Sequence, residues 1–406
     1  MIRTYAEMLL ARGLAILGSF GVAILTARML GPAERGRYYY IITLAAIGLQ
    51  LASLGVHSSN TYLVARRPAL LAQIMANSAW IAVVAGVVAA AGVVLFDLAI
   101  GGSQPDYAYL AAAVLALTPS LLLFLYLTNI AIALNRVRAF NGLIILNGLV
   151  AIAAALCAAY SSPALGGFLV AAVGAALISS FVAWGVLARG VDIPLRFDVP
   201  LFYEGIAFAL RAHLAALLGF FMSRMSVLVL RQFGEPADLG YWSIAAQIAD
   251  ALLILPATVG LLLFPKFLRV ESKARRDQYK GALVQMTLLM ATVCLVCAAL
   301  ARPVFAIIFG SAYGPAVDII LALLPGVFAL SLCAVSSQFL SSGGIPLSQL
   351  MAWLCGMGLQ AALSAALFDY VGAVGLAWIQ SACVGFVAVW LVFDSFRARG
   401  AKGPRP

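Results

Sequence analysis

Long apolar runs dominate the chain, and short polar or turn-rich segments separate them at nearly regular intervals. A helix needs about 20 apolar residues to cross roughly 30 Å of hydrocarbon, and each run has about that length. The pattern therefore predicts an all-α integral membrane protein with about twelve transmembrane helices. The predicted spans lie near residues 8–28, 38–60, 76–98, 107–132, 140–160, 164–188, 206–230, 240–264, 281–301, 316–340, 348–368 and 372–394.

A polar stretch, Arg189 to Pro200, separates the first six predicted spans from the last six. We therefore predict two six-helix bundles, residues 1–190 and 191–406. Two loops indicate an internal duplication, because RMLGPAERGRYY at 28–39 resembles RQFGEPADLGYW at 231–242. Six spans separate the copies, so the halves are predicted to be parallel repeats related by an axis along the membrane normal. Two such bundles would enclose a central cavity and give alternating access by rocking around it.

Composition narrows the class of protein further. With 64% hydrophobic and 10% charged residues, the chain has too little polar surface for a soluble globular protein. The six cysteines all fall in apolar runs, which favours free thiols over disulfides, and no metal or cofactor is expected. The net charge of +10 is spread over short loops instead of one face, which argues against nucleic acid as a partner.

Lys and Arg gather in alternate loops, as the positive-inside rule requires of real spans. Arg35, Arg37 and Arg302 are the main exceptions, in loops that otherwise carry Asp97, Asp106 and other acids. The basic set is predicted to be cytoplasmic, with both termini on that side. It comprises Arg3, Arg66, Arg67, Arg136, Arg138, Arg189, Arg196, the cluster from Lys266 to Lys280, and the tail from Arg397.

Several motifs resemble the polysaccharide transport family of the multidrug/oligosaccharidyl-lipid/polysaccharide exporter superfamily. Residues 27–38 resemble its A-R-x-L-G-P-x-x-x-G-x-Y, and residues 309–316 resemble its F-G-x-x-Y-x-x-A. Further similar stretches lie at 223–226, 237–245, 249–256 and 263–266. The chain departs from the pattern at Ser226, where an Asp is common, and at Gly205-Ile-Ala in place of Gly-Leu-Pro.

The resemblance implies a flippase, not an enzyme, that moves a polyprenyl-pyrophosphate-linked oligosaccharide from the inner to the outer leaflet of the bacterial cytoplasmic membrane. It implies a role in polysaccharide or lipopolysaccharide biosynthesis, with membrane lipids and the pathway's glycan polymerase or glycosyltransferases as partners. A multidrug or other lipid-substrate exporter of the same superfamily is the main alternative. A membrane glycan polymerase or ligase is a weaker one, because the outer loops are short and motifs such as G-x-S-x-G or H-E-x-x-H are missing.

Ionisable side chains inside the membrane point to the site, since they are costly unless they face a wet cavity or a partner. Arg12 and Ser19 share a face of the first span with Ala23 and Thr26. On the seventh span His213 and Arg224 share a face, and Arg211 points away. The predicted substrate-binding residues are Arg12, Arg224, Arg211, His213 and Ser19.

The two cavity arginines, Arg12 and Arg224, are expected to hold the pyrophosphate, because guanidinium groups bind phosphate with paired hydrogen bonds. Alternatively, Arg224 pairs with Asp250 of the neighbouring span and locks the second bundle. The alternative for Arg211 is that its side chain extends to the lipid headgroups. The alternative for His213 is that it only packs between helices. Asp250 is the only deeply placed acid and is the candidate for ion coupling.

Overall fold

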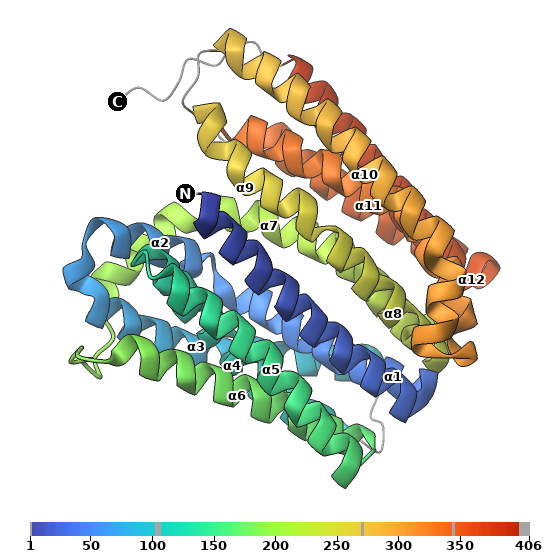
Figure 1. Ribbon diagram of the computed structural model, residues 1–406, viewed down its shortest axis with the longest axis horizontal. Coiled ribbons are helices and arrows are strands. Elements are labelled where there is room, and N and C mark those ends of the chain that lie inside the picture. The colour runs from blue at the N-terminus through green and yellow to red at the C-terminus, as the bar shows by residue number, and fades with distance from the viewer. Residues whose placement is uncertain (1, 102–106, 269–271, 343–345, 398–406) are drawn as a thin grey trace. The chain divides into compact units, whose positions relative to one another are not determined.

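The computed structural model describes residues 2–101, 107–268, 272–342 and 346–397, and Figure 1 shows them as an all-helical chain. The elements are α1 (Ile2–Ser53), α2 (Val56–Arg66), the short 3₁₀ helix η1 (Pro68–Leu70), α3 (Leu71–Gly101), α4 (Tyr107–Ala133), α5 (Val137–Ser161), α6 (Leu165–Ala188), α7 (Val199–Phe233), α8 (Pro236–Leu252), α9 (Ile254–Leu268), α10 (Ser272–Phe309), the 3₁₀ helix η2 (Ser311–Tyr313), α11 (Gly314–Ser341) and α12 (Leu347–Arg397).

Within the described residues, 10 helical segments are long and apolar enough to cross a membrane. Two of these, α1 and α12, are each two helices joined at a glycine with non-helical backbone, Gly31 and Gly372. Each therefore supplies two of the predicted spans. The prediction of an all-α membrane protein with about twelve transmembrane helices is confirmed.

The two related loops use the same local chemistry to end one helix and begin the next. Gly31 has φ of 72°, a left-handed conformation that glycine adopts without steric cost, and Pro32 follows it. In the second loop Pro236 begins α8, and the Asp238 carboxylate accepts a hydrogen bond of 3.1 Å from the Glu235 N–H. Proline suits a helix start because the N–H that it lacks would have no helical partner at that position.

Two predicted spans are interrupted, which the sequence pattern did not indicate. Window 38–60 breaks at Leu54 and Gly55, both with positive φ, so that α2 follows α1. Window 240–264 breaks at Leu253, between α8 and α9. Gly55 packs directly on α7, because a Cβ there would lie 2.9 Å from the Ala209 carbonyl oxygen and from Cβ of His213. Apolar periodicity cannot reveal such a break, because both sides of it remain apolar.

The chain forms two compact units, Met1–His213 and Leu214–Pro406, whose boundary falls inside α7. In the first unit α4 packs against α1, α2, α3, α5 and α6, and Figure 1 shows α3 to α6 side by side. In the second unit α11 packs against α8, α9, α10 and α12. The predicted division into residues 1–190 and 191–406 stays a prediction.

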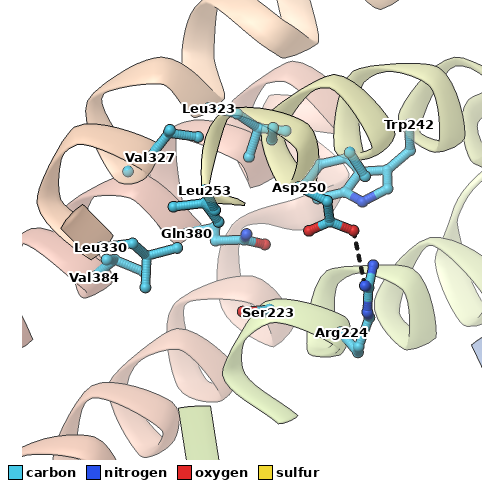
Figure 2. A pocket seen from close by; sticks show the side chains of 13 residues that line it. Ser223, Arg224, Trp242, Asp250, Leu253, Leu323, Val327, Leu330, Gln380 and Val384 are labelled. Carbon is cyan, nitrogen blue, oxygen red and sulfur yellow. Dashed lines mark hydrogen bonds and ion pairs between the residues drawn. The ribbon is translucent and has the colours of Figure 1, made fainter. Parts of the chain in front are cut away.

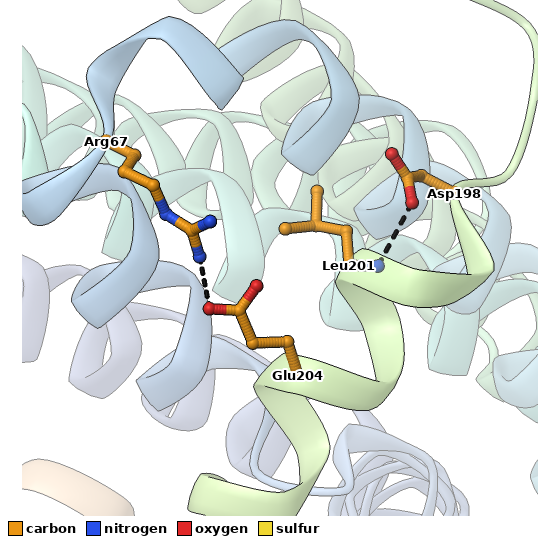
Figure 3. Close-up of polar contacts among 4 residues, drawn as sticks. All are labelled: Arg67, Asp198, Leu201 and Glu204. Carbon is orange, nitrogen blue, oxygen red and sulfur yellow. Dashed lines mark hydrogen bonds and ion pairs between the residues drawn. The ribbon is translucent and has the colours of Figure 1, made fainter.

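Polar contacts hold the linker before α7 and the start of α7, and Figure 3 shows those of Asp198 with Leu201 and of Arg67 with Glu204. The Asn77 side chain forms two hydrogen bonds of 2.8 Å with the backbone of Asp198, as donor to its carbonyl and as acceptor from its N–H. The Asp198 carboxylate in turn accepts a bond of 3.0 Å from the Leu201 N–H and so caps α7. Arg67 forms an exposed ion pair with Glu204. These contacts determine where α7 begins.

Candidate functional site

A small cavity lies within the second unit, between α7, α8, α11 and α12 (Figure 2). The space between its side chains that protein atoms do not fill is about 430 Å³, including solvent at its opening. Its polar wall consists of Ser223, Arg224, Trp242, Asp250 and Gln380, and apolar residues such as Leu323, Val327, Leu330 and Val384 form the rest. All the lining residues belong to helices that sequence analysis predicted to span the membrane.

Arg224 and Asp250 form an ion pair in this cavity, with 2.8 Å between Nη2 of Arg224 and Oδ2 of Asp250. The Arg224 guanidinium also lies 5.7 Å from the centroid of the Phe220 ring. The Arg224 side chain is 20% exposed and that of Asp250 48%. A charge at the centre of a spanning helix costs about 2.5–3.5 kcal/mol when it faces lipid. Both members of the pair line the cavity and remain partly exposed.

This pairing is the alternative that sequence analysis left open for Arg224. Its exposure distinguishes it from a sealed structural lock, because nearly half of the Asp250 side chain is accessible. Arg224 offers five N–H donors, and phosphate can receive two of them in parallel. The cavity therefore presents a guanidinium and a partly exposed carboxylate side by side.

A neutral polar cluster lies next to the cavity at Ser226, one of the positions at which the sequence departs from the family pattern that it resembles. The Ser226 hydroxyl donates to Oε1 of Gln380 at 2.6 Å and accepts from Nε2 of Gln360 at 3.2 Å. Ser226 and Gln360 are fully buried, and Gln380 lines the cavity. The three side chains connect α7 to α12 without any charge. The sequence shows only a serine and isolated glutamines in apolar spans. That pattern did not indicate that these side chains form hydrogen bonds with one another.

One wall of the cavity depends on an interruption of α11. Pro325 lies inside α11 and has no N–H to donate to a helical hydrogen bond. One residue further on, the Ser381 hydroxyl of α12 lies between the Gly326 N–H and the Ala322 carbonyl, which pair with each other in a regular helix. Ser381 donates to the Ala322 carbonyl at 2.6 Å and accepts from the Gly326 N–H at 3.1 Å. A Cβ on Gly326 would lie 2.8 Å from Oγ of Ser381. This arrangement requires glycine at 326 and brings α12, with Gln380, against α11.

Ser19 and His213, the candidates of the first unit whose side chains the structure describes, do not line this cavity. Ser19 is exposed, and its hydroxyl donates to the Ile16 carbonyl at 2.8 Å. Ala23 and Thr26, expected on the same cavity-lining face, are buried, so that face is not one continuous exposed stripe. His213 is buried at 6% exposure. The side chains of Arg12 and Arg211 lie outside the described residues.

A buried acid in the first unit was missed. Asp97 was expected in an outer loop, but it lies within α3 at 1% exposure and accepts a hydrogen bond from the Tyr40 hydroxyl. The correction has a simple cause, because α3 continues to Gly101 and carries Asp97 inside the packed bundle. A single acid at the end of an apolar run does not indicate whether it lies in a loop or inside the packed bundle.

Comparison with known proteins begins with the sequence. A family model described as "polysaccharide biosynthesis protein" matches residues 25–318, which is more than half of the chain. No curated protein matches the chain by sequence.

Several solved structures share the fold. The lipid II flippase MurJ in an inward closed conformation superposes with a TM-score of 0.75 at 13% identity, over 97% of this chain and 87% of that chain. An inward-facing multidrug resistance MATE family transporter of the MOP superfamily gives a TM-score of 0.69 at 14% identity, over 94% of each chain. A MATE transporter of Vibrio cholerae gives 0.66 at 12% identity, over 98% of each chain. At these identities the likeness establishes the fold.

Proposed function

The chain belongs to the polysaccharide biosynthesis protein family, and from that premise we propose that it is a flippase for a polyprenyl-pyrophosphate-linked oligosaccharide. The observation that carries the proposal is the accessible Arg224–Asp250 pair in a cavity among membrane helices. A pyrophosphate headgroup needs such a cationic partner inside the membrane, while its polyprenyl tail remains in the bilayer. The similarity to the MurJ flippase in fold is consistent with this cargo class.

Binding proceeds by exchange of counterions at Arg224. In the structure Asp250 pairs with the guanidinium at 2.8 Å. An arriving pyrophosphate carries more charge and offers oxygens in the geometry that suits the guanidinium fork, so it displaces the carboxylate. Asp250 then turns toward water, which its 48% exposure allows. Arg12 is proposed to contact the headgroup from the first bundle, with Ser19, Arg211 and His213 as further polar groups.

The bundles, residues 1–190 and 191–406, are proposed to rock around this headgroup and expose it alternately to the two leaflets. With the protein in a bacterial cytoplasmic membrane and both termini inside, the membrane potential drives the anion outward. The gain is about 2.3 kcal/mol per charge per 100 mV. Outward movement of the pyrophosphate therefore needs no bound cofactor and no catalytic step. The pathway's polymerase or glycosyltransferases, including those of lipopolysaccharide synthesis, are the proposed partners.

A multidrug exporter is the second candidate, and one observation favours it. Asp250 places an accessible carboxylate in the cavity, which suits a cationic ligand, and the fold also resembles MATE transporters. Under this alternative Asp250 binds the cargo and Arg224 is its resting counterion. The two candidates therefore assign opposite roles to the two members of one ion pair.

Reconstitution separates them. Purified protein in liposomes is given a fluorescent polyprenyl-pyrophosphate glycan, and its arrival in the opposite leaflet is measured with an impermeant quencher. We expect Arg12→Ala and Arg224→Ala to abolish this movement while the protein still inserts, and Asp250→Asn to retain it. If Asp250→Asn abolishes transport of a cationic dye and the glycan lipid is never moved, the exporter replaces the flippase.

A further inference from the structure

The linker between α6 and α7, residues 189–198, lies against the side of α3. The Trp80 indole N–H of α3 donates to the Leu195 carbonyl at 2.8 Å, and Asn77 of α3 binds the last residue of the linker as described above. Asn77 lies six residues and Trp80 nine residues after the first residue of α3, which is about 9 Å and 14 Å along the helix. Both belong to the span predicted at 76–98. The linker therefore reaches the level at which the hydrocarbon of the bilayer is predicted to begin.

Hydrogen bonds occupy several backbone groups of the linker. The Val191 N–H donates to the Ala188 carbonyl at 3.0 Å. The Leu195 carbonyl and both backbone groups of Asp198 are bonded to α3. Unpaired backbone groups are costly close to hydrocarbon, so non-helical chain is tolerated there only where such groups have partners. These bonds suit a loop that lies at the boundary between lipid headgroups and acyl chains.

The side chains that the linker presents outward are mainly apolar. Leu195 is 89% exposed, and Phe197 and Val199 are exposed as well. Tyr203, 67% exposed, lies one turn after Val199 on the same face of α7, and Trp80 is exposed beside the linker. Tryptophan and tyrosine are enriched where a membrane protein crosses the bilayer surface. We refer to this surface as the linker face, which consists of Trp80, Leu195, Arg196, Phe197, Val199 and Tyr203.

Basic side chains surround this end of the first unit. One apolar core cluster joins the ends of α2, α4 and α6 to the starts of α3, α5 and α7, so the arginines that flank these helix ends lie at one end of the bundle. These exposed arginines are Arg66, Arg67, Arg136, Arg138, Arg189 and Arg196. Of the described acids at this end, Glu204 pairs with Arg67, Asp198 caps α7, and Asp192 is exposed. The excess of positive charge is complementary to an anionic lipid surface.

We propose that the linker face is a membrane-binding surface whose partner is a leaflet of anionic phospholipid. Leu195 and Phe197 insert at the boundary between headgroups and acyl chains, and Trp80 and Tyr203 lie at the same level. Arg196 binds the lipid phosphate, because a guanidinium donates paired hydrogen bonds to phosphate oxygens. The loop that joins the two halves of the chain is thereby anchored in the membrane instead of lying in water. This contact with lipid does not depend on the cargo proposed above.

Fluorescence quenching in lipid nanodiscs tests the insertion. The full-length protein carries an environment-sensitive fluorescent amino acid in place of Leu195, introduced by codon suppression because the chain already contains six cysteines. The matched control carries it in place of Asp192, which is exposed on the same linker. The quenchers are iodide in the water and lipids with a spin label near the top of the acyl chain. We expect lipid to quench the probe at 195 and iodide to quench the probe at 192.

The headgroup preference is measured with spin-labelled phosphatidylglycerol and phosphatidylcholine at equal mole fraction. The probe at 195 should be quenched more strongly by the anionic lipid. Arg196→Gln should reduce that preference about fivefold, the contribution of one arginine close to an anionic leaflet. Arg37→Gln is the control, because Arg37 is an exposed arginine in the loop that follows the first predicted span, and it should leave the preference unchanged.

Three results would overturn the proposal. Iodide may quench the probe at 195 as strongly as the probe at 192, which places the linker in water. The two lipids may quench equally in the protein with native Arg196, which excludes the headgroup contact. Weak quenching at 195 by every agent would mean that a protein partner or a second copy covers the surface. The comparison of the two lipids decides the matter even if Arg196→Gln folds poorly, and transport is not measured, so failure of the flippase proposal leaves this result unaffected.

Discussion

The cavity of the second unit and the helix break of the first treat polar side chains in opposite ways. At the cavity, Arg224 and Asp250 remain partly accessible, at 20% and 48%. At the break, Tyr126 is fully buried and its hydroxyl donates to the Ser53 carbonyl at the end of α1. Both regions place polar atoms in apolar helices. The two regions therefore differ in the accessibility of their polar groups and not in polarity, and the variants below test whether that difference separates ligand binding from helix packing.

The largest effect that tests this comparison is expected at Arg224. Arg224→Ala should reduce translocation of the glycan lipid more than about 100-fold, because hydrogen bonds to a charged group contribute about 1.5–3 kcal/mol each and the guanidinium makes two with phosphate. Arg224→Lys keeps the charge but loses the planar fork, so a loss of about tenfold is expected. The measurement is the initial rate in the liposome assay.

The double variant Arg224→Ala/Asp250→Asn controls for an unpaired charge in the cavity. It removes both members of the pair, so the thermal unfolding midpoint should return close to the wild-type value while translocation stays lost. Recovery of transport in this double variant would mean that the arginine serves only to neutralise the aspartate.

The next largest effect is expected at the cavity wall formed by α11 and α12. Gly326→Ala places a Cβ within 3.0 Å of the Ser381 backbone, which cannot move without shifting α12. We expect a loss of about 1–3 kcal/mol in the free energy of unfolding, the usual cost of overpacking. Gly358→Ala on α12 is the matched control, because nothing lies within 4 Å of its added Cβ. Equal midpoints for the two variants in thermal denaturation would contradict the close fit of α11 and α12.

In the first unit, Asn77 tests the attachment of the linker. Asn77→Ala leaves the Asp198 backbone groups without partners and should cost about 1–3 kcal/mol in the free energy of unfolding. Asn77→Asp retains the acceptor and loses the donor, so a cost at least as large is expected. Protease cleavage between residues 189 and 198 reports the same change locally. An unchanged cleavage rate in both variants would show that the linker is held by other contacts.

The smallest effect is expected at the exposed ion pair of the linker. The hydrogen bond from Arg67 lowers the pKa of Glu204 below its ordinary value of 4.5. A carboxyl with a depressed pKa stabilises the folded state above its unfolded pKa, and this contribution is lost as the pH falls through the folded value. Acidification from pH 6 to pH 3.5 should therefore lower the thermal midpoint slightly more in the wild type than in Glu204→Gln. Parallel midpoints across this range would indicate a pair that contributes nothing, as many surface pairs do.

Parts of the site could be predicted from the sequence. The free-energy cost of a charged side chain in an apolar segment can be recognised from that segment alone. Arg224 and Asp250 stand out as ionisable groups in apolar windows, and pairing between their neighbouring spans is one of the two predictions made for Arg224. Ser226 stood out only as a departure from a family pattern. Its partners Gln360 and Gln380 come from other helices, more than 130 residues away in the chain, and no local pattern connects them.

The sequence by itself determined that this is a helical membrane protein of about twelve spans, because length and hydropathy are properties of each segment alone. It also determined the family, through short loops whose glycines and prolines impose their own backbone geometry. Only the tertiary structure decided which polar groups are accessible and which side chains lie together at the cavity. It also decided where the predicted spans 38–60 and 240–264 are interrupted. Those features depend on packing between distant helices, which a one-dimensional pattern does not contain.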